Sequence, residues 1–248
     1  MLSLRQALSL NSSRVLGGDF SKFSCDFDGV DDCIGIANSA DLRPTSALSI
    51  SLWVKPHGWG VFLQQDGGNT NLRFRIRVSS TQTDCSGSNG YLTAELNDTI
   101  TPTLSGWVHV VATYSAGVAK LKYNNLTTGV TNATGCSSAT IHYFGAPLAV
   151  HIGADAANGG GGEAGTFLEG KIDDVAIFNT ALSDADITSI YNNGKPNDIS
   201  GMSGLIGYWQ MGDPNGQASF PTIVDASSNS NDGTMLNMAA ADIQTDVP

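Results

Sequence analysis

Charged residues are scarce in this sequence, and basic residues are the scarcest of them. Only 14% of the chain is charged, and 12 Lys and Arg stand against 23 Asp and Glu, which gives a formal net charge of −11. Nucleic acid binding depends on cationic surfaces that displace phosphate counterions, so we expect no nucleic acid partner. Hydrophobic residues still make up 41% of the chain, which argues against disorder, and a helical bundle would carry more charge.

Long hydrophobic runs are also missing. No stretch approaches the roughly 20 apolar residues that span a bilayer, so we expect no membrane insertion. In the first segment, MLSLRQALSLNSSRVLGG, polar residues interrupt what would be the apolar core of a signal peptide. We therefore interpret residues 1–20 as a leader that docks the protein to a partner. The protein would then reach an extracellular location by another route, such as assembly into a virus particle.

Motifs for hydrolytic catalysis are absent as well. The sequence contains neither G-x-S-x-G nor E-x-D-x-E, although a retaining glycoside hydrolase needs two carboxyl groups about 5 Å apart. Asp173 and Asp174 are adjacent, so a regular strand would direct them to opposite faces. Glu95 has only Thr93 and Asn97 as neighbours on its own face. We therefore expect a protein that is not an enzyme.

The four cysteines have neither the spacing of a zinc site nor that of a thioredoxin-like site. They are Cys25, Cys33, Cys85 and Cys136. Several interpretations stay open. Cys25 with Cys33 and Cys85 with Cys136 would form two disulfides across turns and loops, but four cysteines allow three pairings and the sequence does not choose among them. Four reduced thiols agree with the sequence equally well.

Alternation of apolar and polar residues is what this sequence has in abundance. Leu48, Ile50, Leu52 and Val54 take every second position of ALSISLWVKP, which is typical of a strand with one buried face. The same period recurs in FSKFSCDFDG, NLRFRIRVS, GYLTAELN, GWVHVVATY, VAKLKYNN, LAVHIGA, GKIDDVAIFN and GLIGYWQM. Many short strands joined by polar turns predict an all-β fold of two stacked antiparallel sheets.

One internal segment, SDADITSIYNNGKP, predicts a short helix. Ser183 and Asp186 have the spacing of a capping box, which satisfies free backbone N–H groups at a helix start. Ile187 and Ile190 fall on one face of this helix. We expect Gly194 to supply the left-handed residue that ends it.

Four segments of the sequence carry a family resemblance. They are FDGVDDCIGIANSADLRPTSALSISLWVKP, GWVHVVATY, GKIDDVAIFNTALSDADITSIYNNG, and GYWQMGD with IVDASSNSNDGT. Together they resemble the laminin-G-like and pentraxin-like branch of the concanavalin A-like superfamily. The resemblance implies one antiparallel two-sheet jelly-roll sandwich over residues 21–248. In that family the GYW segment precedes the FDGVDD strand, whereas here it follows. We therefore expect a permuted domain in which residues 204–248 supply the closing strand and tail, with a truncated second domain as the alternative.

The combination of leader, sandwich and tail also resembles virion-associated proteins of bacterial, especially marine, viruses. This resemblance implies a location on the surface of an extracellular virus particle, in an oligomeric assembly with other virion proteins. Our leading hypothesis is a non-enzymatic, lectin-like virion surface protein that binds glycan or a host receptor. One alternative is an architectural capsid decoration or tail subunit that contacts only viral proteins. Another is a secreted glycan-binding or glycoside hydrolase module.

Calcium is the cofactor that the sequence favours, in a structural role. Asp28, Asp31 and Asp32 crowd one turn, and DASSNSND places Asp225, Ser227, Asn229 and Asn231 at every second position, all with oxygen atoms of the kind that Ca²⁺ prefers. The second loop is not an EF-hand, because it lacks the required Gly and Glu. The alternative is a loop whose side chains satisfy its own backbone. By resemblance, Asp155 in HIGADAANGG matches one acidic position of the ligand-bridging calcium site of pentraxin-like proteins.

Two further groups of residues are candidates for binding a ligand. Arg73, Arg75 and Arg77 form a positive stripe in an acidic protein, suited to a sulfated glycan, a carboxylate or an acidic neighbouring subunit, although a solvated sheet face explains it equally well. Trp53 and Trp59 are expected to be able to stack on sugar rings, whereas Trp107 and Trp209 are expected in the core.

Overall fold

The computed structural model describes residues 20–58, 60–66, 74–79, 84–86, 92–97, 106–124, 126–131, 141, 149–155 and 167–248. Of the predicted leader, residues 1–20, only Phe20 is among them, so the leader itself lies outside the described residues.

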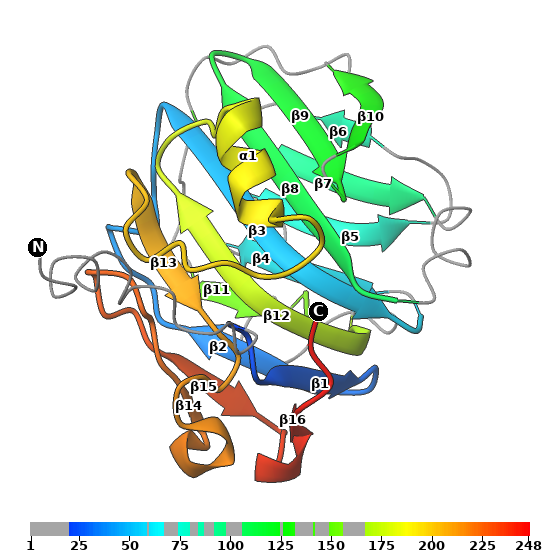
Figure 1. Ribbon diagram of the computed structural model, residues 1–248, viewed down its shortest axis with the longest axis vertical. Helices are drawn as coiled ribbons and strands as arrows, with labels where there is room; N and C mark the ends of the chain where they lie inside the picture. Colours follow the sequence, from blue (N-terminus) through cyan, green and yellow to red (C-terminus); the bar gives the residue numbers. More distant parts are fainter. Residues whose placement is uncertain are drawn as a thin grey trace, which may run out of the picture.

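Two eight-stranded sheets stack face to face, which confirms the predicted all-β sandwich (Figure 1). The first sheet has the order β10 (Leu126–Thr131), β9 (Val118–Tyr123), β8 (Val108–Ser115), β3 (Ala47–Pro56), β12 (Glu169–Phe178), β1 (Ser24–Asp28) and β16 (Ile243–Gln244), and β13 (Leu205–Trp209) also pairs with β12. The second sheet has the order β14 (Thr222–Ile223), β15 (Gly233–Leu236), β2 (Cys33–Ile36), β11 (Ala149–Ile152), β4 (Gly60–Asp66), β5 (Phe74–Ser79), β7 (Leu92–Asn97) and β6 (Asp84–Ser86). The pairs described are antiparallel, apart from the parallel pair β5 and β7.

A hydrophobic core fills the space between the two sheets. Leu48, Ile50, Leu52 and Val54 of β3 are completely buried in it, as the alternation predicts. Burying one such side chain stabilises the fold by about 1.5–3 kcal/mol. The second sheet contributes Ile34, Ile36, Phe62, Leu63, Val150 and Ile152.

The outer face of the first sheet is covered as well, which the sequence pattern does not predict. Ser49, Ser51 and Trp53 of β3 lie on this face and are buried. α1 (Asp184–Tyr191) and the chain that follows it run across the face (Figure 1). A second apolar cluster fills the gap beneath them, so β3 is buried on both sides. This cluster consists of Val111, Ala176, Phe178, Leu182, Ile187, Ile190, Ile199 and Tyr208.

α1 begins as the sequence predicts but ends earlier. The Oγ atom of Ser183 accepts a hydrogen bond from the backbone N–H of Asp186, and the Asp186 carboxylate accepts one from the N–H of Ser183, which confirms the capping box. The left-handed end of the helix is Asn192, with φ of 41°, and Gly194 follows it with φ of 91°. Asn tolerates this conformation better than most residues, so the helix does not need Gly194 to end. Among the described residues, no helix is both long and apolar enough to cross a membrane.

A β-bulge interrupts β12 at its centre. The register with β3 shifts after Asp173, and Asp174 adopts a left-handed φ of 46°. Ile172 and Val175, on either side of the two acids, both point into the core. The prediction that Asp173 and Asp174 point to opposite faces is therefore wrong. The extra residue of the bulge turns both side chains to the outer layer, where Asp174 contacts Tyr208.

Residues 204–248 add strands to both sheets. In the first sheet β16 pairs with β1, with Ile243 opposite Cys25, and β13 pairs with β12. In the second sheet β15 pairs with β2, with Met235 opposite Ile34. Of the segments expected to come first in relatives, the GYW segment therefore lies beside β12 here, and Gly233 and Thr234 lie beside β2. The permutation and the predicted boundaries after residue 20 and before residue 204 stay predictions.

Two of the cysteines are buried in the described part of the chain, and both are free thiols. Cys25 and Cys33 do not form the disulfide that the sequence left open. The Sγ atom of Cys25 lies 3.8 Å from the backbone oxygen of Met211. Burial raises the pKa of both thiols, that of Cys33 to about 11. Cys136 and the side chain of Cys85 lie outside the described residues.

Candidate functional site

An acidic turn directly after β1 is a candidate metal site. Carboxylate oxygens of Asp28, Asp31 and Asp32 all lie within 4.8 Å of one another. Asp28 and Asp31 are exposed, whereas Asp32 is buried. In the described part of the chain, no other trio of His, Cys, Asp or Glu side chains comes this close together. The structure therefore brings together the acids that the sequence placed in one turn.

The backbone of this turn is held by two of the three acids. One oxygen of Asp28 accepts hydrogen bonds from the N–H groups of Val30 at 2.7 Å and Asp31 at 3.3 Å. One oxygen of Asp32 accepts the N–H of Asp28 at 3.1 Å. Gly29 has φ of 77°, a conformation that a residue with a side chain rarely adopts. The turn is thus fixed by its own hydrogen bonds, and its remaining carboxylate oxygens are available to a cation.

The electrostatics of the turn favour a cation. Burial raises the pKa of Asp32 to about 6, and the negative charges of Asp28 and Asp31 add to this effect, while the N–H group of Asp28 opposes it. A bound cation would offset the repulsion among the three acids. Ca²⁺ takes 6–8 oxygen ligands, so the carboxylates would hold it together with backbone oxygens and water.

The loop after β14 uses its oxygens differently. One carboxylate oxygen of Asp225 accepts the N–H groups of Tyr208 and Ser227, each at 2.9 Å, and the other accepts the N–H of Asn231 at 2.8 Å. Asp232 in turn accepts the N–H of Asp225 at 2.9 Å. Asp225 is buried, so its carboxylate fixes the loop to β13.

Ser227 and Asn229, the other predicted ligands in this loop, also serve the backbone. The Oγ atom of Ser227 accepts the N–H of Asn229 at 3.2 Å, and the side-chain amide of Asn229 donates to the backbone oxygen of Ile206 at 2.9 Å. These contacts correspond to the alternative expected from the sequence, a loop whose side chains form hydrogen bonds with backbone groups. Calcium binding by this loop stays a prediction.

Asp155 lies shortly after the end of β11, a strand of the second sheet. Its carboxylate accepts a hydrogen bond from the side-chain amide of Gln64, a buried residue of β4. Burial lowers the pKa of His151 in β11, and the negative charge of Asp155 opposes this shift. Asp155 is not a member of the acidic trio, and the Gly-rich segment after it lies outside the described residues.

Trp53 is not placed to stack on a sugar. Its exposed fraction is 2%, because His109 and Tyr191 cover it, with ring centroids at 4.9 Å and 5.9 Å from its own. The Nε2 atom of His109 lies 2.8 Å from the Oγ atom of Ser51. Burial lowers the pKa of His109 to about 3, so the ring is neutral. The expectation for Trp53 failed because α1 covers a strand face that alternation alone leaves open.

The other predicted ligand residues fall largely outside the described part. Trp59 and Arg73 are not among the described residues. Arg75 and Arg77 lie in β5, in register with Gln64 of β4 and Glu95 of β7 respectively, and only their backbone is described. Ligand binding by this stripe stays a prediction.

A buried acidic pair lies at the bulge of β12. Asp173 accepts hydrogen bonds from the hydroxyl of Ser21 and from the N–H of Asp174, and Asp174 accepts the hydroxyl of Tyr208 at 2.6 Å. The second carboxylate oxygen of Asp174 has no hydrogen-bond partner. Burial raises the pKa of both acids, that of Asp174 to about 7, and the charge of Asp174 raises the pKa of Asp173 further. The apolar periodicity of the sequence does not predict that both side chains lie on the same face, because this depends on the bulge.

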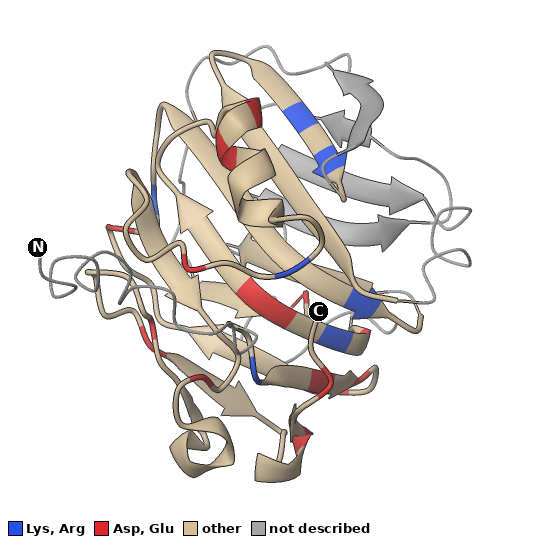
Figure 2. Cartoon of the chain, in the orientation of Figure 1, with Lys and Arg blue, Asp and Glu red and all other residues tan. Residues whose placement is uncertain are grey.

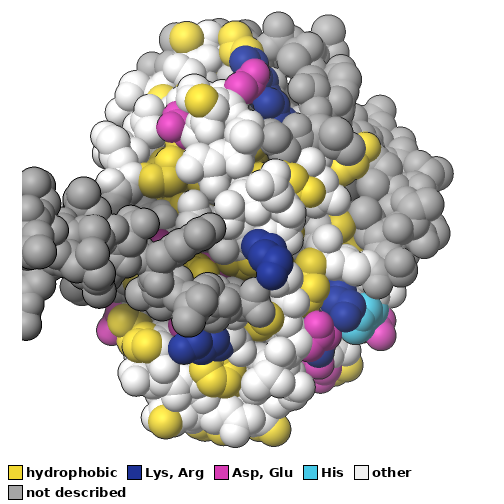
Figure 3. Space-filling view, viewed as in Figure 1, with side chains coloured by type: hydrophobic (Ala, Val, Ile, Leu, Met, Phe, Trp, Pro, Cys, Tyr) yellow, Lys and Arg dark blue, Asp and Glu magenta, His cyan; other side chains and the backbone are white. Residues whose placement is uncertain are grey.

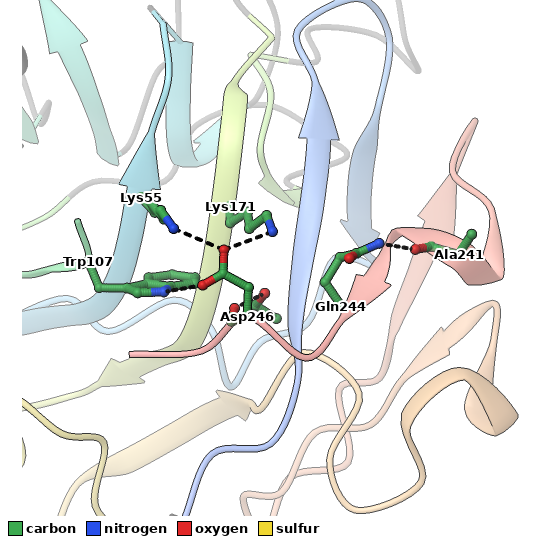
Figure 4. Close-up of polar contacts among 7 residues, drawn as sticks. Lys55, Trp107, Lys171, Ala241, Gln244 and Asp246 are labelled. Carbon is green, nitrogen blue, oxygen red and sulfur yellow. Dashed lines mark hydrogen bonds and ion pairs between the residues drawn. The ribbon is translucent and has the colours of Figure 1, made fainter. Parts of the chain in front are cut away.

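Two strand residues and the residue just before a third strand bind one carboxylate near the C-terminus (Figure 4). The Nζ atoms of Lys55 and Lys171 each lie 2.9 Å from one oxygen of Asp246, and the indole nitrogen of Trp107 lies 3.3 Å from the other. Burial raises the pKa of Asp246, but the hydrogen bonds from Lys171, Lys55 and Trp107 outweigh it and lower the pKa to about 2. Trp209 is in the core as expected, whereas Trp107 is half-buried and donates to Asp246. No pattern in the sequence predicts that these residues lie together.

A family model matches the greater part of the sequence. The family is described as the concanavalin A-like lectin/glucanases superfamily, and the match covers residues 28–188. None of the curated proteins compared with the chain matches it.

Solved structures share the fold at low sequence identity. A "putative carbohydrate binding protein" from Bacteroides ovatus matches with a TM-score of 0.59 and 16% identity, over 91% of this chain and 60% of that one. The full extracellular region of zebrafish Gpr126/Adgrg6 matches with a TM-score of 0.51 and 10% identity, over 93% of this chain and 27% of that one. The present chain thus spans only part of each of these proteins, and at such identities the likeness concerns the fold alone.

Proposed function

Because the chain belongs to the concanavalin A-like lectin/glucanases superfamily, we propose that it is a lectin-like protein that binds glycan and catalyses no reaction. The observation that carries this proposal is the match of 91% of the chain to the Bacteroides ovatus structure, which is described as a "putative carbohydrate binding protein".

The absence of catalysis is supported by the state of the carboxylates. In the described residues, the adjacent acids Asp173 and Asp174 are both buried. Asp173 accepts hydrogen bonds from the hydroxyl of Ser21 and from a backbone N–H, and Asp174 accepts one from the hydroxyl of Tyr208. A glycoside hydrolase instead presents two carboxyl groups to the bound sugar. The acids of the turn after β1 are suited to binding a cation, and the bound cation would stabilise this edge of the sandwich.

We place the protein on a virus particle as part of the same proposal. The support is the resemblance of its leader and tail to virion-associated proteins. In such a location the leader would dock the chain to other virion proteins in an oligomeric assembly, and the sandwich would face a host glycan or receptor. Mass spectrometry of purified particles tests this location, and absence of the chain from them would contradict it.

Binding of the purified full chain to a glycan array tests the function. We expect saturable binding to a subset of glycans, with binding retained in Asp174→Asn, which replaces one of the two adjacent acids. Silence across a broad array would favour the architectural alternative, in which the sandwich contacts only viral proteins. Release of reducing sugar from a bound glycan would contradict the absence of catalysis.

A further inference from the structure

Trp107, Lys55 and Lys171 form a row across three neighbouring strands of the first sheet. Lys171 of β12 is directly opposite Lys55 of β3. Val54 of β3 is opposite Val108 of β8, so Trp107, which precedes β8, lies beside Lys55. The three side chains point away from the core, because Val54, Val108 and Ile172 point into it. We call this row the outer-face row.

The outer-face row contains two positive charges that face each other on adjacent strands. Two like charges directly opposite each other on adjacent strands destabilise the pair. The chain has only 12 basic residues and a net charge of −11, yet it sets Lys55 against Lys171. Figure 2 shows these strands carrying Lys or Arg beside the C-terminus, and Figure 3 shows basic, acidic and His side chains gathered at the lower right of the same face. An anion between the two ammonium groups removes the repulsion.

In this structure the anion is the side chain of Asp246. One oxygen of Asp246 accepts hydrogen bonds from both lysines, and the other accepts one from the indole N–H of Trp107 (Figure 4). A carboxylate with three donors from separate parts of the sheet is the geometry of a bound acid rather than of an isolated surface ion pair. The row therefore recognises a carboxylate, and the chain itself supplies one.

The segment that supplies Asp246 is anchored before this residue, by Ile243 in the core and by the side-chain amide of Gln217, which donates to the backbone oxygen of Ile243 at 3.1 Å. β16 pairs with β1 at only two positions, Ser24 with Gln244 and Cys25 with Ile243. Beyond β16, the hydroxyl of Ser24 donates to the backbone oxygen of Asp246 at 2.7 Å. The side chain of Asp246 is 39% exposed, and partly exposed ion pairs contribute little to stability. A ligand that offers the same carboxylate together with further contacts can therefore displace it.

We propose that Trp107, Lys55 and Lys171 form a binding site for the carboxylate of an acidic glycan, a uronate or a sialate, which Asp246 occupies when no glycan is bound. This inference rests on the proposed function and adds the class of ligand. A sugar carboxylate takes the place of the Asp246 carboxylate between the two ammonium groups. The half-buried indole of Trp107 offers the adjoining sugar ring an apolar surface, as tryptophan does in many sugar sites. Asp246 thus lowers the apparent affinity as an internal competitor.

Calorimetric titration of the full chain tests this site with defined probes. The probes are an oligogalacturonate, a sialyllactose, a neutral oligosaccharide of the same length as the first, and an oligoglutamate peptide. The variants are Asp246→Ala, which frees the site, and Asp246→Ala combined with Lys55→Gln and Lys171→Gln, which removes it. Asp41→Ala is the matched control, because Asp41 is an exposed loop acid outside the row. Circular dichroism confirms that each variant is folded.

We expect Asp246→Ala to bind one of the two acidic saccharides roughly tenfold or more tightly than the unaltered chain, and the triple variant to lose this gain. Asp41→Ala should bind like the unaltered chain. The saccharide that gains affinity decides between uronate and sialate. An equal gain for oligoglutamate would overturn the assignment to a glycan. Neutral-glycan binding without any gain for acidic probes would overturn this site and leave the proposed function standing, and the absence of binding to every saccharide would overturn both.

Discussion

The hydroxyl of Tyr208 lies 2.6 Å from a carboxylate oxygen of Asp174, and this contact joins β13 to the bulge of β12. Tyr208 is held at its other end too, because its backbone N–H donates to Asp225. One residue therefore connects the bulge in the first sheet to the loop that leads toward β15. Both acids are buried, so each of these contacts affects stability more than a surface hydrogen bond would.

Replacing Tyr208 with Phe should destabilise the protein. The variant removes the hydrogen bond to Asp174 and leaves that carboxyl with both oxygens short of a donor side chain. We expect the free energy of unfolding in urea to fall by about 1–3 kcal/mol. Tyr191→Phe is the control, because the ring of Tyr191 keeps its stacking on Trp53. Equal stability of Tyr208→Phe and the unaltered chain would contradict the role given to this contact.

Asp174 should make the stability of the protein depend on pH. Burial raises its pKa from 3.8 to about 7 in the folded chain, so the folded state holds a proton that the unfolded state releases. The stabilisation from this proton is fully present below about pH 4 and is lost as the pH rises through about 7. Asp174→Asn keeps an acceptor for Tyr208 and tolerates the left-handed φ of 46°.

Urea unfolding at a series of pH values measures this effect. Between pH 4 and pH 8, the stability of Asp174→Asn relative to the unaltered chain should rise with pH, because only the unaltered chain loses the proton at residue 174. A constant difference between the two proteins over this range would show that Asp174 is ionised throughout.

Asp225 should contribute more to stability than any single residue of its loop. Asp225→Ala leaves the backbone N–H groups of Tyr208, Ser227 and Asn231 without their acceptor. Since an unsatisfied buried donor costs about 1–3 kcal/mol, we expect a loss of about 3 kcal/mol or more in the free energy of unfolding. Ser227→Ala removes a single N–H acceptor and should cost less. A smaller effect of Asp225→Ala than of Ser227→Ala would contradict this reading of the loop.

Calcium should stabilise the chain through the acidic turn after β1. A cation that binds only the folded state raises the melting temperature as its concentration rises above its dissociation constant. We expect millimolar Ca²⁺ to raise the melting temperature above that in EDTA, and Asp28→Asn with Asp31→Asn to abolish this shift. Ser227→Ala with Asn229→Ala should retain it. Loss of the shift in the second pair alone would move the calcium site to the loop after β14.

The sequence predicts the parts of this fold that depend on local pattern. Alternation in β3 identifies the core side of the strand, and the spacing of Ser183 and Asp186 identifies the start of α1. Both follow from interactions within a few residues. The buried outer face of β3 is different, because the residues that cover Trp53 and Ser51 come from α1 and β8, far along the chain.

The candidate sites show the same division. Asp28, Asp31 and Asp32 are close in the sequence and close in space, so composition alone suggests a metal site there. The row that binds Asp246 cannot be found in this way, because its members lie in β3, in β12 and just before β8, and Asp246 comes from a distant segment. The roles of Asp173 and Asp174 depend on a β-bulge, and the apolar pattern of the sequence does not predict the extra residue that the bulge inserts.

Glycan binding by the sandwich is the central claim, and saturation-transfer NMR measures it most directly. The full chain is mixed with a panel of soluble neutral and acidic oligosaccharides, and the transfer of magnetisation from protein to sugar protons is recorded. We expect transfer to at least one oligosaccharide, reduced by an excess of the same sugar and retained in Asp174→Asn. The absence of transfer to every member of the panel would contradict the account.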